Sequence, residues 1–198
     1  MLRSVLLTAL IAFSASVSAQ GFDYNYVSVG YSQVDIDSTI QGATIDGGAF
    51  GLGGSYGLND DIFAFGSFQD GELEEPGDPD NIDVTVYDIG FGYRMPMSDT
   101  VDFVTTLSYE YMELSEPGLS VDESGLGIGV GIRANASDTI ELNAGIEYVD
   151  LGTVFGDDTS FAAGVLYSLT ESIDIGLNGN WGDDVSQYTL SGRFYFGN

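Results

Sequence analysis

The chain has 198 residues, and its 31 acidic residues against four basic ones give a formal net charge of −27. So acidic a chain offers no basic face for phosphate, which excludes nucleic acid as a partner. It also contains no cysteine, so a closed sheet or a large core, rather than disulfides, must hold the fold together.

The first element along the chain is an export signal. Residues 1–19 carry one cation, Arg3, then an apolar run, then small residues ending at Ala19. This order predicts a signal peptide that is cleaved after Ala19. The apolar run is too short to span a bilayer as a helix. Residues 20–198 then form a single domain, because their length suits one domain and not two.

Ten segments of alternating hydrophobicity follow, separated by clusters of Gly, Asn, Asp, Ser and Pro. This pattern is typical of strands joined by turns. The segments are 23–34, 45–58, 61–70, 82–94, 101–113, 123–134, 139–151, 159–168, 172–182 and 185–196. Each is long enough for a tilted barrel strand of about 9–11 residues.

One face of these segments is apolar, whereas the other carries glycine and polar residues, and no helical segment is available to cover the apolar face. We therefore expect lipid to cover it. The sequence predicts an all-β fold, a closed antiparallel up-and-down transmembrane β-barrel of ten strands. Eight strands are the alternative, because the first segment has weak alternation and the eighth is short.

The connections differ in length. Those at 58–61, 95–100, 135–138 and 169–171 are short, whereas 35–44, 71–81, 114–122 and 152–158 are longer and rich in Asp, Glu, Gly and Pro. Short turns of outer-membrane barrels face the periplasm and long loops face outside. We expect the same orientation for this chain.

The last segment carries a family resemblance. Residues 187–196 alternate polar and apolar side chains and end on aromatics, although Gly197 and Asn198 follow. With the signal and the hairpins, the chain resembles the small bacterial outer-membrane β-barrel superfamily of opacity proteins and the barrel domain of outer membrane protein A. The resemblance implies the cell outer membrane of a Gram-negative bacterium as the location. It implies lipid, lipopolysaccharide and the outer-membrane assembly machinery as partners, with a monomeric barrel and no cofactor.

The polar face of the segments points into the predicted lumen, which we expect to be polar. It carries Arg94, Arg133 and Arg193, the only cations after the signal. Each arginine has an acid across a hairpin, which predicts the pairs Arg94–Asp102, Arg133–Glu141 and Arg193–Asp174. Further lumen acids are Asp88, Glu110 and Glu147. The pairs either neutralise buried charge or form a filter at the periplasmic mouth.

One outer connection is a candidate divalent-cation loop. It contains Glu72, Glu74, Glu75, Asp78 and Asp80. Carboxylate oxygens are ligands that calcium and magnesium prefer, but the spacing does not match a twelve-residue calcium loop. The alternative interpretation is a solvated run of charge.

The sequence predicts no enzyme, because barrel hydrolases and acyltransferases generally rely on a histidine and this chain has none. The predicted function is a structural or membrane-integrity role, with narrow passive passage of small solutes as its extension. The alternative is a surface interaction protein or adhesin that acts through acidic extracellular loops. A soluble barrel that holds an apolar ligand is opposed by the polar inward face.

Overall fold

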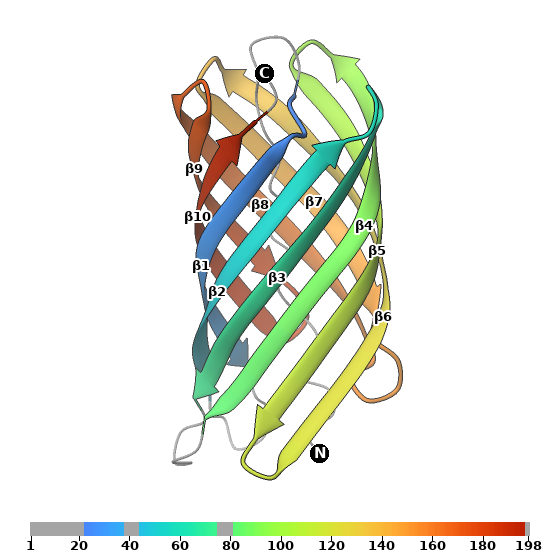
Figure 1. Cartoon of the computed structure of the whole chain (residues 1–198), viewed down its shortest axis with the longest axis vertical. Helices are drawn as coiled ribbons and strands as arrows, with labels where there is room; N and C mark the ends of the chain where they lie inside the picture. Colours follow the sequence, from blue (N-terminus) through green and yellow to red (C-terminus); the bar gives the residue numbers. More distant parts are fainter. Residues whose placement is uncertain (1–21, 38–43, 75–80, 197–198) are drawn as a thin grey trace.

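The computed structural model describes residues 22–37, 44–74 and 81–196. These residues form ten antiparallel strands that close into a barrel, with each strand beside its sequence neighbours and β1 beside β10 (Figure 1). The strands are β1 (Tyr26–Asp37), β2 (Thr44–Gly57), β3 (Ile62–Glu74), β4 (Ile82–Ser98), β5 (Val101–Glu116), β6 (Leu119–Ser137), β7 (Ile140–Asp150), β8 (Asp157–Thr170), β9 (Ile173–Trp181) and β10 (Val185–Tyr195). The predicted ten-stranded barrel is confirmed and the eight-stranded alternative is wrong. Among the described residues, no helix is long and apolar enough to cross a membrane.

The two ends of the barrel differ. The connections β2–β3, β4–β5, β6–β7 and β8–β9 lie at one end, together with the start of β1 and the end of β10. We call this the short-turn end, and the opposite end the loop end; the β5–β6 hairpin at the bottom of Figure 1 belongs to the loop end. The sequence analysis predicts that the short-turn end faces the periplasm.

The predicted loop 114–122 is wrong in extent. β5 and β6 continue their ladder through Glu113↔Asp122 and Ser115↔Ser120, so only a tight turn remains between the strands. Gly118 adopts a positive φ of 88° in this turn, a conformation that glycine reaches without a steric penalty. Acidic side chains in the segment made it resemble a loop, although its alternation continues.

The polarity of the inward and outward faces inverts along the strands, although the same alternate positions point inward throughout. On β4, Ile89 and Phe91 point outward with 64% and 62% of their surface exposed, while Asp88 points inward. Nearer the loop end, Val84 points inward and is buried, while Asp83 is exposed. A strand in lipid presents apolar side chains outward, whereas a strand surrounded by water must turn them inward. The inversion therefore marks where the barrel wall leaves the apolar layer.

The prediction that the lumen is polar is therefore wrong at the loop end, where buried apolar side chains form a cluster that we call the collar. The collar comprises Val34, Ile36, Ile45, Ala49, Leu73, Ile82, Val84, Val86, Met112, Leu151, Phe155 and Val185. Leu151 and Phe155 come from the β7–β8 connection, which Glu123 holds by accepting hydrogen bonds from the Val154 and Phe155 amides. The middle of the lumen is polar.

Candidate functional site in the barrel lumen

Arg133 on β6 forms the most buried ion pair of the lumen. Its Nε lies 3.0 Å from Glu141 Oε1, and its Nη2 donates to Glu141 Oε2 at 3.1 Å. Each of the two residues is only 1% exposed. The short turn between β6 and β7 places Glu141 opposite Asn135. Arg133 lies two residues before Asn135 on the same strand, so its side chain reaches Glu141 diagonally. A bidentate contact of this kind fixes the guanidinium in one orientation.

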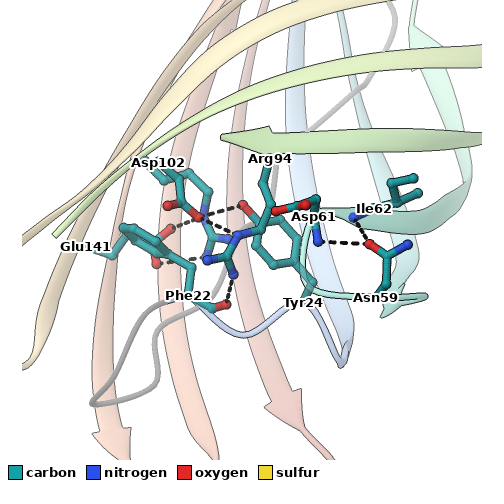
Figure 2. Close-up of polar contacts among 9 residues, drawn as sticks. Phe22, Tyr24, Asn59, Asp61, Ile62, Arg94, Asp102 and Glu141 are labelled. Atoms are coloured by element: carbon teal, nitrogen blue, oxygen red, sulfur yellow. Dashed lines mark hydrogen bonds and ion pairs between the residues drawn. The ribbon is translucent and has the colours of Figure 1, made fainter. Parts of the chain in front are cut away.

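Arg94 on β4 joins the barrel wall to the residues that precede β1 (Figure 2). Its Nε lies 3.3 Å from Asp102 Oδ2, and its Nη1 donates to the Phe22 carbonyl at 3.0 Å. Asp102 also accepts a hydrogen bond from the Tyr24 hydroxyl. Arg94 keeps 20% of its side chain exposed, so it borders water where Arg133 does not.

Arg193 and Asp174 face each other in register across β9 and β10, but a tyrosine stands between them. Arg193 Nη1 donates to the Tyr195 hydroxyl at 3.2 Å, and that hydroxyl donates to Asp174 Oδ2. The sequence analysis did not name Tyr195. Its signal was its inward position two residues after Arg193 on the same strand.

The residues that precede β1 enter the short-turn mouth of the barrel. Phe22 and Tyr24 are buried there, and the Arg133 guanidinium lies 4.4 Å from the Phe22 ring centre and 4.5 Å from that of Tyr24. Tyr24 also stacks on Phe63 of β3, with ring centres 4.4 Å apart. Cation–π contacts strengthen when they are removed from water. The rings therefore stabilise an arginine that would otherwise be costly to bury.

Together these side chains fill the short-turn mouth, and we call them the arginine–aromatic plug. The plug consists of Phe22, Tyr24, Phe63, Arg94, Asp102, Val104, Arg133 and Glu141. The sequence analysis missed Phe22, Tyr24 and Phe63. For Phe22 and Tyr24 the signal was the every-second-residue spacing of Phe22, Tyr24 and Tyr26, which is the inward parity of β1.

The three further lumen acids lie between the plug and the collar. Asp88 on β4, Glu110 on β5 and Glu147 on β7 are all buried. Within the described part of the chain, the two ion pairs shorter than 4 Å are those of Arg94 and Arg133, so neither includes these acids. The Ser67 hydroxyl donates to Asp88 Oδ2.

The candidate divalent-cation loop is only partly described. Glu72 and Glu74 lie at the end of β3 and point outward, and Glu72 accepts a hydrogen bond from Asn81. Glu75, Asp78 and Asp80 lie outside the described residues, as does the predicted signal peptide, residues 1–19. Among residues 22–37, 44–74 and 81–196, no group of three or more acidic, histidine or cysteine side chains gathers as a metal site.

The outer wall carries a hollow of about 870 Å³ near the loop end, over β1 to β5. Small residues, Gly47, Gly48 and Gly71, form part of it. Its acidic members are Asp46, Asp70, Glu72, Glu74, Asp83 and Glu113. The hollow lies where the wall has already changed to polar outward side chains.

A closed antiparallel barrel with an apolar outer wall defines the class of membrane β-barrels. The family described as outer membrane protein beta-barrel domain matches residues 5–168. The chain belongs to this family, and its place is therefore the outer membrane. A search of curated proteins finds no match.

Solved structures agree with this fold. An outer-membrane channel from Pseudomonas putida F1 is 13% identical, with 95% of this chain and 100% of that chain covered and a TM-score of 0.59. The NanC porin is 10% identical, with 86% and 100% covered and a TM-score of 0.57. The translocator domain of the autotransporter NalP from Neisseria meningitidis is 12% identical, with 88% and 89% covered and a TM-score of 0.53. At such identities the likeness concerns the fold alone.

Proposed function

We propose that the protein is a structural barrel of the outer membrane that supports membrane integrity, with a lumen closed to steady passage of solutes. The arginine–aromatic plug is the observation that carries this proposal. Phe22, Tyr24, Arg133 and Glu141 are all nearly inaccessible to water. A hydrated ion therefore has no path at their level unless these side chains move.

Moving the plug is energetically unfavourable. Arg133 would have to leave Glu141, its bidentate partner, inside a mouth that excludes water. Leaving one member of a buried pair without its partner costs about 3–5 kcal/mol, which favours the closed arrangement by about 100-fold or more. The apolar collar at the other end adds a second barrier, because it offers an ion no polar partner.

Planar-bilayer recordings test the closed lumen. Refolded protein, shown to be folded by its heat-modifiable gel migration, is expected to give no steady conductance. A steady, cation-preferring open state in the unaltered protein would contradict the proposal and support the narrow passage.

The membrane-integrity role has its own test. Cells that lack the protein are expected to admit large antibiotics and bile-type detergents more readily, and the unaltered gene should restore the barrier. If deletion leaves permeability unchanged, the structural role is wrong, whatever the bilayer recordings show.

A surface interaction role is the second candidate, because the acid-lined hollow gives it a specific site. Asp46, Asp70 and Glu113 line this hollow on the outer wall near the loop end. Such a concave negative surface attracts cationic partners. Replacing its acids with their amides should abolish attachment to a cationic surface while barrel folding is retained. Unchanged attachment would remove this candidate.

A further inference from the structure

The connection between β7 and β8 lies beside a step in the barrel wall at the loop end. β6 pairs with β5 along its first residues but with β7 only from Leu126 onward. Residues 119–125 of β6 therefore have a neighbouring strand on one side only. The β7–β8 ladder ends at Asp150. The residues that follow, 151–156, lie against this part of β6, and we call them the strap.

A glycine on β6 lets the strap begin on the inner side of the wall. Gly125 has the inward parity of Arg133 on the same strand. A Cβ placed on Gly125 would lie 1.6 Å from the Asp150 carbonyl oxygen and 2.9 Å from the Leu151 Cα. Backbone can approach this closely only where no side chain intervenes. The strap therefore starts by crossing the inner face of β6.

The strap is held by two kinds of contact. Leu151 and Phe155 are 3% and 9% exposed and belong to the collar, and Val154 packs against it. The polar contact comes from Glu123 on β6, whose Oε2 accepts hydrogen bonds from the Val154 amide at 2.6 Å and the Phe155 amide at 3.3 Å. Hydrogen bonds to a charged acceptor are the stronger kind. One carboxylate thus holds two consecutive amides of the strap.

The backbone of the strap is organised as a separate unit. In the described part of the chain, its backbone hydrogen bond is internal, from the Leu151 amide to the Gly156 carbonyl at 2.8 Å, so no ladder joins the strap to β6. Gly152 and Gly156, near its two ends, have φ values of 77° and 85°, which glycine adopts without a steric penalty. A few such residues at the ends of elements can absorb the rotation of a hinge. Releasing Glu123 therefore frees the strap while the β7–β8 ladder persists.

We propose that the strap is a lid over the collar and that Glu123 is its latch. In the closed state Leu151 and Phe155 complete the collar, and in the open state the collar side chains beneath them become accessible to solvent. Met112 reports on this change, because it is the register partner of Glu123 across β5 and β6 and is 1% exposed. The lid goes beyond the closed lumen proposed above, since opening it leaves the plug at the other end in place.

The test uses Met112→Cys in the full chain, folded in detergent. The chain has no cysteine of its own, so a charged maleimide labels position 112 alone. Labelling should be at least about tenfold faster in M112C/E123A than in M112C, because the latch consists of hydrogen bonds to a charged group. M112C/E123Q should give an intermediate rate, since glutamine keeps an acceptor oxygen without the charge. The matched control M112C/D122A removes an exposed acid next to Glu123 and should label as slowly as M112C.

Phe155 provides a second measurement that needs no cysteine. It is buried in the closed strap, so chymotrypsin should cleave after Phe155 slowly in the unaltered protein and at least about tenfold faster in E123A, as cleavage follows the population of the open form. Hydrogen exchange of the β7 and β8 amides should stay unchanged. Equal labelling and cleavage with and without Glu123 would overturn the latch. Faster exchange along β7 and β8 in E123A would overturn the lid, because the wall would then open together with the strap.

Discussion

The two ends of the lumen are closed by different chemistry. At the short-turn end, charged and aromatic side chains contact one another around Arg133, whereas at the loop end aliphatic side chains form the collar. The difference follows from what surrounds the wall. Where lipid surrounds the wall, apolar side chains point outward and the inward positions carry polar groups, which must form hydrogen bonds and ion pairs with one another. Beyond the apolar layer, the collar packs as the core of a water-soluble protein does.

The largest effect is expected from removing the cation of the plug. Arg133→Ala leaves Glu141 buried without its partner and should lower the free energy of unfolding by about 3–5 kcal/mol. Urea titration in detergent micelles measures this. R133A/E141A removes both charges and should recover a substantial part of the loss. If the double variant is as unstable as the single one, Arg133 acts through packing on Phe22 and Tyr24 and not through its charge.

The collar should respond to lost volume and not to lost charge. Ile36 on β1 is 1% exposed within the collar, so Ile36→Ala should cost about 2–5 kcal/mol by the cavity that it creates. Ile36→Val should cost about 0.5–1.5 kcal/mol. Neither loss should depend on salt. A salt-dependent loss would mean that the two ends do not differ in the way described.

The tyrosine between Arg193 and Asp174 tests whether polar contacts of the lumen need their hydroxyl groups. Tyr195→Phe keeps the ring beside Arg193 but removes the hydroxyl that donates to Asp174. Leaving a buried acceptor unsatisfied costs about 1–3 kcal/mol, which urea titration can resolve. A loss below this range would mean that Arg193 reaches Asp174 directly once the hydroxyl is gone.

The sequence was sufficient for the barrel because period-two alternation reports directly on a wall with lipid on one side. Hairpin spacing also placed Arg133 near Glu141 and Arg94 near Asp102, since antiparallel register follows from a short turn. Spacing could not reveal that Tyr195 stands between Arg193 and Asp174. Register determines which residues lie opposite each other, but not which side chain makes the hydrogen bonds between them. Nor could it reveal that Phe22 and Tyr24 enter the mouth, because that contact joins segments about 70 or more residues apart. The collar was missed because the alternation was read with one polarity throughout.

The smallest effect is expected at the water-facing edge of the plug. Arg94 forms its ion pair with Asp102 while 20% of its side chain remains exposed, so solvent screens much of the interaction and Arg94→Lys should cost less than about 1 kcal/mol. The lysine also loses the fork that lets Arg94 hold Asp102 and the Phe22 carbonyl at once. We therefore expect the start of the chain to loosen more than the barrel does. Hydrogen exchange should show faster exchange of the Tyr24 amide in R94K, with the amides of β4 and β5 unchanged. Equal acceleration in the strands would show that Arg94 stabilises the barrel itself. The water-facing edge of the plug would then contribute to barrel stability in the same way as its buried interior.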